Sequence, residues 1–256
     1  MRTWKNTWRN GSAWNRHNHR MAIDPSVKEM TPEQRERWAW GFVVVLGLLA
    51  LAWGVQTYAP HLFRTTAPKV DQTIQGKLQD GDIIFQTSRS NQSRAIQLAT
   101  GSSYSHCGLL FHAGPTFKKW FVVEAVQPVK CTPLAQWIQK GEGDHYVVKR
   151  LMDPLDSVER IALRMAAEQF IGTDYDLYFG WSDERIYCSE LVWKAYKQAT
   201  GLQVGDLQPL GKFDISVPAV AQKLKERYGE DIPLHEPVIS PAAIFESPLL
   251  ESVIAQ

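Results

Sequence analysis

Short apolar runs alternate with polar turns in the first half of the main part of this chain, whereas longer amphipathic stretches fill the second half. The short runs are typical of strands, and we expect strands over residues 82–86, 107–112, 121–126 and 145–151. Apolar residues at helical spacing predict helices over 93–100, 132–140, 157–170, 188–200 and 217–228. Strands followed by helices indicate an α+β fold rather than alternating βαβ units.

Polar residues, glycines and prolines predict where several of these elements end. The candidate N-terminal caps are Ser90 or Asn91, Thr132, and Asp156 or Ser157. Gly141 and Gly201 follow two of the expected helices and predict their ends. Gly114 and Pro115 predict a turn that joins strands 107–112 and 121–126 into a hairpin. Prolines recur after residue 207 and predict an extended return of the chain over the domain.

An apolar stretch precedes this domain. Residues 38–63 contain no Lys, Arg, Asp or Glu, and residues 38–58 would span roughly 30 Å as a helix, the thickness of a bilayer core. Trp38 and Tyr58 near its two ends suit the two membrane interfaces. We therefore expect a transmembrane helix or signal anchor over 38–58. A buried core helix is the alternative, which the position ahead of the domain disfavours.

The charge distribution sets the expected orientation and the domain boundaries. Residues 1–59 hold eight basic and four acidic residues, a net charge of +4, so the remainder holds 20 basic and 23 acidic residues, a net charge of −3. The basic flank predicts a cytoplasmic N-terminus and a periplasmic or otherwise extracytoplasmic domain. Secretion after cleavage near Ala50-Leu51-Ala52 is the alternative. The mildly acidic domain argues against nucleic-acid binding.

These observations divide the chain into four parts. We expect a basic, disordered tail over 1–37, the membrane segment over 38–58, a polar linker over 59–77 and one catalytic domain over 78–256. Three cysteines are too few for a disulfide framework, and their spacings match no zinc motif. In an extracytoplasmic domain, Cys107 and Cys131 could pair and leave Cys188 free.

Three polar residues in apolar surroundings are candidates for catalysis. Cys188 opens an amphipathic helix, where the positive end of the helix dipole favours a thiolate. His106 begins an apolar strand, and Gly108 on the same strand face leaves room for another group to approach. Glu124 interrupts the apolar run of the partner strand, where a carboxylate is costly unless it is paired.

Together these residues predict a triad in which Cys188 is the nucleophile, His106 the base and Glu124 the group that orients the imidazole. Taken singly, each has a more ordinary explanation. A lone histidine at a strand end is commonly a surface residue. A lone cysteine at a helix start commonly packs as a small apolar residue, and a glutamate in a strand commonly lies on an exposed face.

The order of several motifs resembles a known family. The motifs are Gly-Asp-Ile-Ile-Phe at 81–85, Ser-His-Cys-Gly at 105–108, Glu124, Gly-Thr-Asp-Tyr-Asp at 172–176 and Tyr-Cys-Ser-Glu-Leu-Val-Trp at 187–193. From residue 78 to the C-terminus, the chain resembles the YiiX/YaeF-like family of circularly permuted papain-fold enzymes, within the NlpC/P60 superfamily. The resemblance implies a papain-like fold with an antiparallel sheet packed on helices and with the histidine before the cysteine.

The resemblance also implies roles for two further residues. Tyr175 would line the substrate cleft, with a packing role in the core as the alternative. Cys107 departs from the family pattern, in which a small aliphatic residue is commoner. We expect it to face away from the cleft, because strand alternation puts it on the side opposite His106.

The implied activity is that of a cysteine-dependent amidase or peptidase of the cell envelope, working through a thioester without metal or cofactor. An envelope peptide or a lipid amide would be the substrate, the N-terminal helix would contact the membrane, and no oligomeric state is predicted. The alternatives are a lipid acyltransferase or thioesterase of the lecithin-retinol acyltransferase type and a non-catalytic ligand-binding domain. The cleft distinguishes the enzymes, because an apolar cavity favours acyl chains and a polar groove favours peptides.

Overall fold

The computed structural model describes Thr31 and residues 72–114 and 119–256. The expected tail, the membrane segment over 38–58 and most of the linker lie outside these residues. One short helix, α2 (Gln72–Gln75), falls at the end of the expected linker. No helix among the described residues is both long and apolar enough to cross a bilayer.

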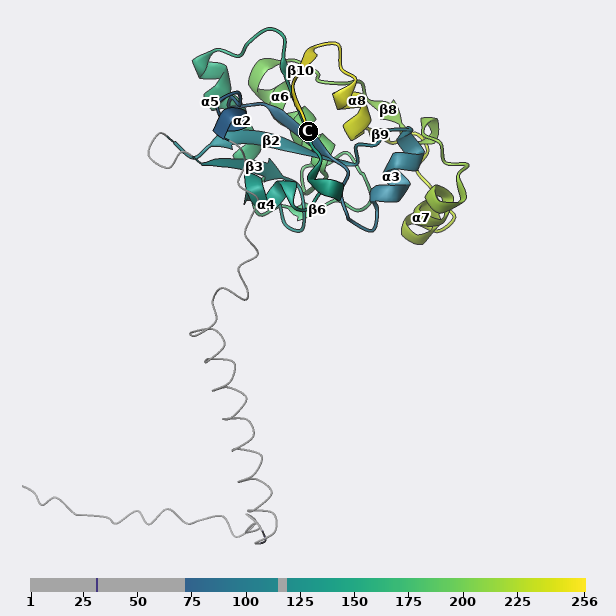
Figure 1. The fold of residues 1–256 in the computed structure, drawn as a ribbon. Coiled ribbons are helices and arrows are strands. Elements are labelled where there is room, and N and C mark those ends of the chain that lie inside the picture. The colour runs from purple at the N-terminus through teal and green to yellow at the C-terminus, as the bar shows by residue number, and fades with distance from the viewer. Residues whose placement is uncertain (1–30, 32–71, 115–118) are drawn as a thin grey trace, which may run out of the picture. The chain divides into compact units, whose positions relative to one another are not determined.

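A six-stranded antiparallel sheet forms the centre of the domain, in the order β10-β5-β1-β2-β3-β4 (Figure 1). Its strands are β1 (Ile83–Gln86), β2 (His106–His112), β3 (Trp120–Glu124), β4 (Lys130–Pro133), β5 (Val147–Leu151) and β10 (Leu250–Ala255). All four predicted strands are therefore present, and the predicted hairpin is the pair β2 and β3. Strand β4 and the edge strand β10 were not predicted.

Helices and two small sheets surround this centre. The helices are α3 (Ser93–Thr100), α4 (Leu134–Ile138), α5 (Ser157–Glu168), α6 (Cys188–Thr200), α7 (Pro218–Tyr228) and α8 (Pro241–Phe245), with 3-10 turns η2 (Glu142–Asp144) and η3 (Leu210–Lys212). The small sheets pair β6 (Asp174–Tyr175) with β7 (Arg185–Ile186) and β8 (Gln208–Pro209) with β9 (Pro237–Val238). The expected α+β arrangement, an antiparallel sheet packed on helices, is confirmed.

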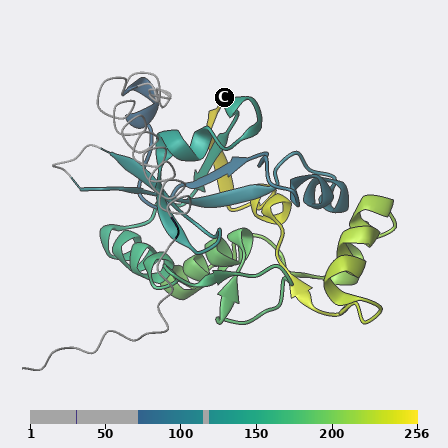
Figure 2. The ribbon, with the colours of Figure 1, turned by 90° about the horizontal axis from the view of Figure 1, so that it is seen from below.

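The two faces of the central sheet bury different sets of side chains. Phe85, Cys107 and Leu109 point to the face that packs against α5 and α6, and both helices lie along that side in Figure 2. Ile84 and Leu110 point to the opposite face, which α4 covers. This period of two is the geometric consequence of the pleated strand, and it decides which strand residues can meet the helix that carries Cys188.

One predicted helix start is wrong, and α3 begins at Ser93 as predicted but without either predicted cap; in both cases a tertiary contact explains the difference. Thr132 lies in β4 rather than at a helix cap, because its hydroxyl donates to Glu124 instead, and α4 begins at Leu134 after the extended Pro133. The residue before α3 is Gln92, whose side chain makes no cap because its amide reaches Tyr175.

Other helix ends follow the sequence signals. The Asp156 carboxylate accepts hydrogen bonds from the backbone N–H groups of Val158 and Glu159 at 2.7 and 2.8 Å, and so caps α5. Gly201 ends α6 with a φ of 76°, a left-handed conformation that favours glycine. The proline-rich return ends as β10, which pairs with β5.

Candidate active site

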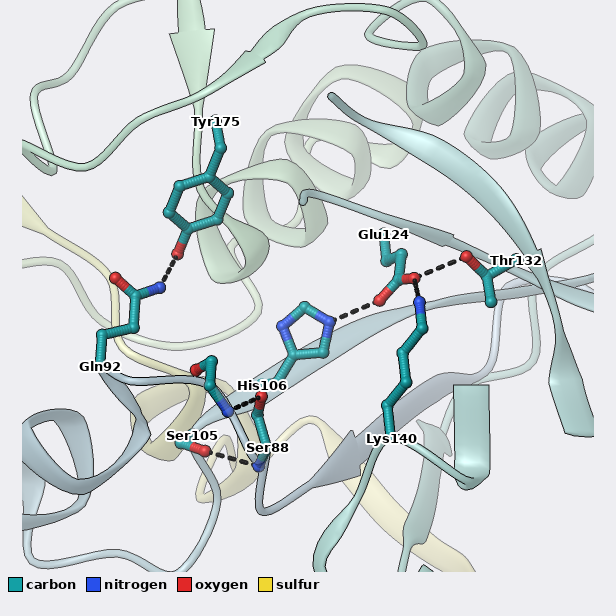
Figure 3. Close-up of polar contacts among 9 residues, drawn as sticks. Ser88, Gln92, Ser105, His106, Glu124, Thr132, Lys140 and Tyr175 are labelled. Carbon is teal, nitrogen blue, oxygen red and sulfur yellow. Dashed lines mark hydrogen bonds and ion pairs between the residues drawn. The ribbon is translucent and has the colours of Figure 1, made fainter. Parts of the chain in front are cut away.

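His106 is the first residue of β2, and its ring is held on two sides. One face stacks on Trp137 of α4, with 5.8 Å between ring centroids and 23° between planes. Its Nε2 donates to Oε2 of Glu124 at 2.7 Å (Figure 3). Since Nε2 is engaged in this way, Nδ1 is the nitrogen available to the substrate side.

Glu124 is fully buried at the end of β3 and accepts a hydrogen bond at each oxygen. Besides His106 at Oε2, the Thr132 hydroxyl and the Lys140 ammonium donate to Oε1 at 2.6 and 2.7 Å. Burial works to raise the pKa of Glu124, but these donors outweigh it and lower the pKa from 4.5 to about 2. The carboxylate therefore stays ionised beside the imidazole.

Gly108 makes the crowded approach of β3 to β2 possible. A Cβ atom at this position would lie 2.5 Å from Cγ1 of Val122, 2.9 Å from the Val123 carbonyl oxygen and 3.5 Å from Cβ of Glu124. The strand can therefore carry Glu124 to His106 only with glycine here.

Cys188 is buried at the first position of α6, and neighbouring segments fix the start of that helix. The Ser189 hydroxyl donates to the Ile239 carbonyl oxygen at 2.8 Å, and the Tyr187 hydroxyl accepts from the Ile239 N–H at 3.1 Å. The first N–H groups of a helix have no intrahelical acceptor, so they point at any group that binds beside Cys188.

The electrostatics of Cys188 and His106 favour the ion-pair form. Hydrogen bonding from the Cys107 thiol, and then from the His106 ring, holds the pKa of Cys188 well below its usual value of 9.0 in spite of burial. Burial lowers the pKa of His106, but the contacts with Cys188 and Glu124 outweigh this and raise it from 6.5 to about 10. These shifts favour a thiolate paired with an imidazolium over a neutral thiol and imidazole.

Cys107 does not face away from the site, contrary to our expectation. Strand alternation does place it opposite His106, but that face of the sheet packs against α6, so its thiol meets Cys188. Burial, followed by the contact with Cys188, raises the pKa of Cys107, which stays a neutral donor. Cys107 and Cys131 are both free thiols, and Cys131 lies on β4, opposite Val123.

Tyr175 lies on β6 at the border between two pockets. Its hydroxyl oxygen accepts a hydrogen bond from Nε2 of Gln92 at 2.7 Å (Figure 3). Both residues line an apolar pocket that includes Cys188 and a polar pocket that includes His106. The structure thus brings all four predicted site residues, Cys188, His106, Glu124 and Tyr175, to one region.

The apolar pocket encloses about 690 Å³ of space, part of it open to solvent. Aliphatic and aromatic side chains form its walls, among them Ile96, Phe179, Leu210, Phe213, Val220 and Leu224. Lys223 and Arg227 of α7 are its cationic residues. The pocket beside the nucleophile therefore suits an uncharged, hydrocarbon-like group.

The polar pocket encloses about 850 Å³ and lies on the His106 side. Amides, hydroxyls and an ammonium line it, among them Gln86, Ser88, Ser90, Gln127 and Lys140. A substrate that occupied both pockets would place its apolar part near the thiol and its polar part near the imidazole.

The sequence patterns did not indicate four residues of this region, Thr132, Lys140, Gln92 and Arg227. Thr132 and Lys140 were assigned to a helix, and only the fold shows that Thr132, on β4, and Lys140, just after α4, face Glu124. Gln92 carries no sequence signal, because its partners Tyr175 and Arg227 lie 83 and 135 residues away. Contacts at such separations depend on the fold.

Comparisons with known proteins identify the family of this chain. Residues 77–254 match the family model of permuted papain-like amidase enzymes of the YaeF/YiiX type. The chain belongs to this family. It is therefore a papain-like hydrolase of the amidase and peptidase class, as the motif order predicted.

Two relatives support the assignment. The uncharacterized protein YiiX of Escherichia coli (strain K12) is 53% identical over 175 residues, which cover 68% of this chain and 85% of that protein. A crystal structure described as metalloprotein yiiX from Escherichia coli O157:H7 matches with a TM-score of 0.67 and 52% identity, over 70% of this chain and 98% of that one.

Proposed function

We propose that the protein is a cysteine amidase in which Cys188, His106 and Glu124 act as a triad through a thioester. The observation that supports this best is the His106 ring, which interacts with both the thiol and a fully buried, ionised carboxylate. A nucleophile, a base and a group that orients the base are the parts that covalent acyl transfer needs.

The proposed reaction follows from the charges of the pair. The Cys188 thiolate attacks the acyl carbon, and the carbonyl oxygen becomes an oxyanion that the N–H groups at the start of α6 stabilise. The His106 imidazolium protonates the leaving amine, so the carbon–nitrogen bond breaks and a thioester remains. Neutral His106 then takes a proton from water, which attacks the thioester and releases the acid and the thiolate.

The apolar pocket supports an apolar acyl group on the substrate. Because it lies beside Cys188, it is on the acyl side of the scissile bond, while the polar pocket beside His106 suits the leaving amine. The same pocket favours a second candidate, a lipid acyltransferase or thioesterase. The two differ in the acceptor, which is water for the hydrolase and an alcohol or amine for the transferase.

No step of the proposed reaction involves a metal ion. One related structure is described as a metalloprotein. In this chain, residues 72–114 and 119–256 contain no group of three or more His, Cys, Asp or Glu side chains that could hold a metal ion. His106 and Glu124 are hydrogen-bonded to each other, so these two side chains are not free to bind a metal ion and do not form a metal site.

We further propose that the domain acts at the cell envelope and is anchored by residues 38–58. The support is the apolar sequence of that segment and its basic flank. Secretion after cleavage remains the alternative, and the mass of the mature protein from the membrane fraction distinguishes the two.

Thiol reactivity tests the proposed nucleophile. In a Cys131→Ser background, which removes the exposed thiol, we expect iodoacetamide to alkylate Cys188 near neutral pH faster than it alkylates glutathione. Cys188→Ala should abolish this rapid alkylation. Alkylation no faster than that of the free thiol would overturn the proposal. Release of amine from N-decanoyl amides and from envelope peptides, with Cys188→Ala as the control, then identifies the acyl group.

A further inference from the structure

A chain of hydrogen bonds leads from α7 to the border of the two pockets. Nη2 of Arg227 donates to Oε1 of Gln92 at 2.9 Å, and Nε2 of Gln92 donates to the Tyr175 hydroxyl oxygen at 2.7 Å. The three residues come from separate segments of the chain, and all three line the pocket that contains Cys188.

The direction of this chain is fixed by the chemistry of its first member. A guanidinium only donates hydrogen bonds, so the Gln92 oxygen must face Arg227 and its nitrogen must face Tyr175. Arg227 is itself held, because its guanidinium lies 4.9 Å from the centre of the Phe179 ring. The Gln92 amide therefore has one orientation.

This orientation decides where the Tyr175 hydrogen can go. Since the phenol oxygen accepts from Gln92, its own hydrogen is not used in that contact, and no described residue accepts it. Burial, followed by the negative charge of Cys188, holds the pKa of Tyr175 well above its usual value of 10.0, so the phenol stays protonated. A protonated phenol beside the thiol is a hydrogen-bond donor that a bound molecule can use.

We propose that Gln92 and Arg227 are positioning residues that turn the Tyr175 O–H toward the carbonyl oxygen of the bound acyl group. Tyr175 then stabilises the oxyanion together with the N–H groups of α6. This inference rests on the proposed function, because it assumes attack by Cys188 on a carbonyl carbon.

Decanal tests this relay, the hydrogen-bonded chain of Arg227, Gln92 and Tyr175, without the natural substrate. The Cys188 thiolate adds to the aldehyde carbon, and the aldehyde oxygen becomes the counterpart of the oxyanion. Tyr175→Phe should weaken the inhibition by decanal of N-decanoyl amide hydrolysis by about 10-fold or more. Gln92→Glu should do the same although it keeps both contacts, because a carboxylate accepts the Tyr175 hydrogen and withdraws it from the site. Arg227→Met should have a smaller effect, and Arg227→Lys should restore part of it.

Two measurements separate the relay from a structural role. Alkylation of Cys188 by iodoacetamide forms no oxyanion, so its rate should stay within about 3-fold in every variant, and the thermal midpoint of Gln92→Glu should equal that of the unaltered protein. Matched controls are Gln97→Glu on α3 and Tyr178→Phe beside β6, which should leave decanal inhibition unchanged. Decanal inhibition of Gln92→Glu equal to that of the unaltered protein would overturn the relay alone. Failure of the unaltered protein to bind decanal would overturn the proposed function and the relay with it.

Discussion

Glu124 and Glu190 are both completely buried carboxylates near the candidate site, yet their acidities differ widely. The pKa of Glu124 is lowered from 4.5 to about 2, whereas the pKa of Glu190 is raised from 4.5 to about 7. Burial pushes both values upward. The difference shows that burial alone does not determine the charge of a carboxylate in this domain.

The number and quality of the donors explain the contrast. Both oxygens of Glu124 accept short hydrogen bonds, one from His106 and two from the side chains at 132 and 140. Glu190 has one cation, Lys194, at 2.8 Å, and a long hydrogen bond of 3.3 Å from the Tyr187 N–H. Desolvation therefore dominates at Glu190, even in the first turn of α6 where the helix dipole favours an anion.

The two carboxylates also support different members of the Cys188–His106 pair. Glu124 stays ionised and stabilises the imidazolium, whereas Glu190 closes the start of the helix that carries Cys188.

Replacing Glu124 with Gln should affect activity most. The variant removes the negative charge at His106, so the pKa of the ring falls and the thiolate forms at higher pH. We expect kcat/KM for N-decanoyl amides to fall about 10²- to 10⁴-fold, with the alkylation profile of Cys188 shifted toward alkaline pH. Glu190→Gln is the matched control and should lose less than about 3-fold. Equal losses in the two variants would contradict the assigned roles.

Glu190 should make stability depend on pH in the neutral range. With a pKa of about 7 when folded and 4.5 when unfolded, it binds more protons in the folded state between these values, so stability falls as pH rises through that window. Across this window, the titration of Glu190 lowers the free energy of unfolding by about 3 kcal/mol. The free energy of unfolding of Glu190→Gln minus that of the unaltered protein should therefore rise between about pH 4.5 and about pH 7. Urea denaturation measures this, and a flat difference would exclude the shift.

Thr132→Val should weaken the support of Glu124 without removing its charge. The loss of one donor to a buried carboxylate should lower the free energy of unfolding at neutral pH by about 1–3 kcal/mol. Thr132→Ser retains the hydroxyl and should lose much less. If the serine variant loses as much as the valine variant, the contribution of Thr132 is packing rather than hydrogen bonding.

Asp183→Asn should have the smallest effect. Asp183 pairs with Lys194 at 2.7 Å, but its side chain is 78% exposed, and exposed ion pairs contribute about 0–1 kcal/mol. Thermal unfolding at low and high salt should show a small difference that salt removes. A larger effect would mean that Asp183 holds Lys194 in place for Glu190.

Local sequence signals predicted the main elements where the cause was local. The Asp156 cap of α5, the end of α6 at Gly201 and the β2–β3 hairpin depend on neighbours within a few residues, so the sequence alone was sufficient. The start of α4 and the edge strand β10 depend on Glu124 and on β5, which lie far along the chain or on another strand. Those two features were missed for that reason.

Local sequence patterns specify the residue types and the order of the site: a histidine at the start of a strand, a carboxylate on its hairpin partner and a cysteine at the start of a helix. Strand period and helix capping act over short distances and leave their pattern in the chain. The contact of Cys107 with Cys188 and the hydrogen-bonded chain of Arg227, Gln92 and Tyr175 arise from the folded arrangement of the chain. Such contacts depend on which sheet face a helix covers and on segments far apart in sequence, and no local pattern encodes either.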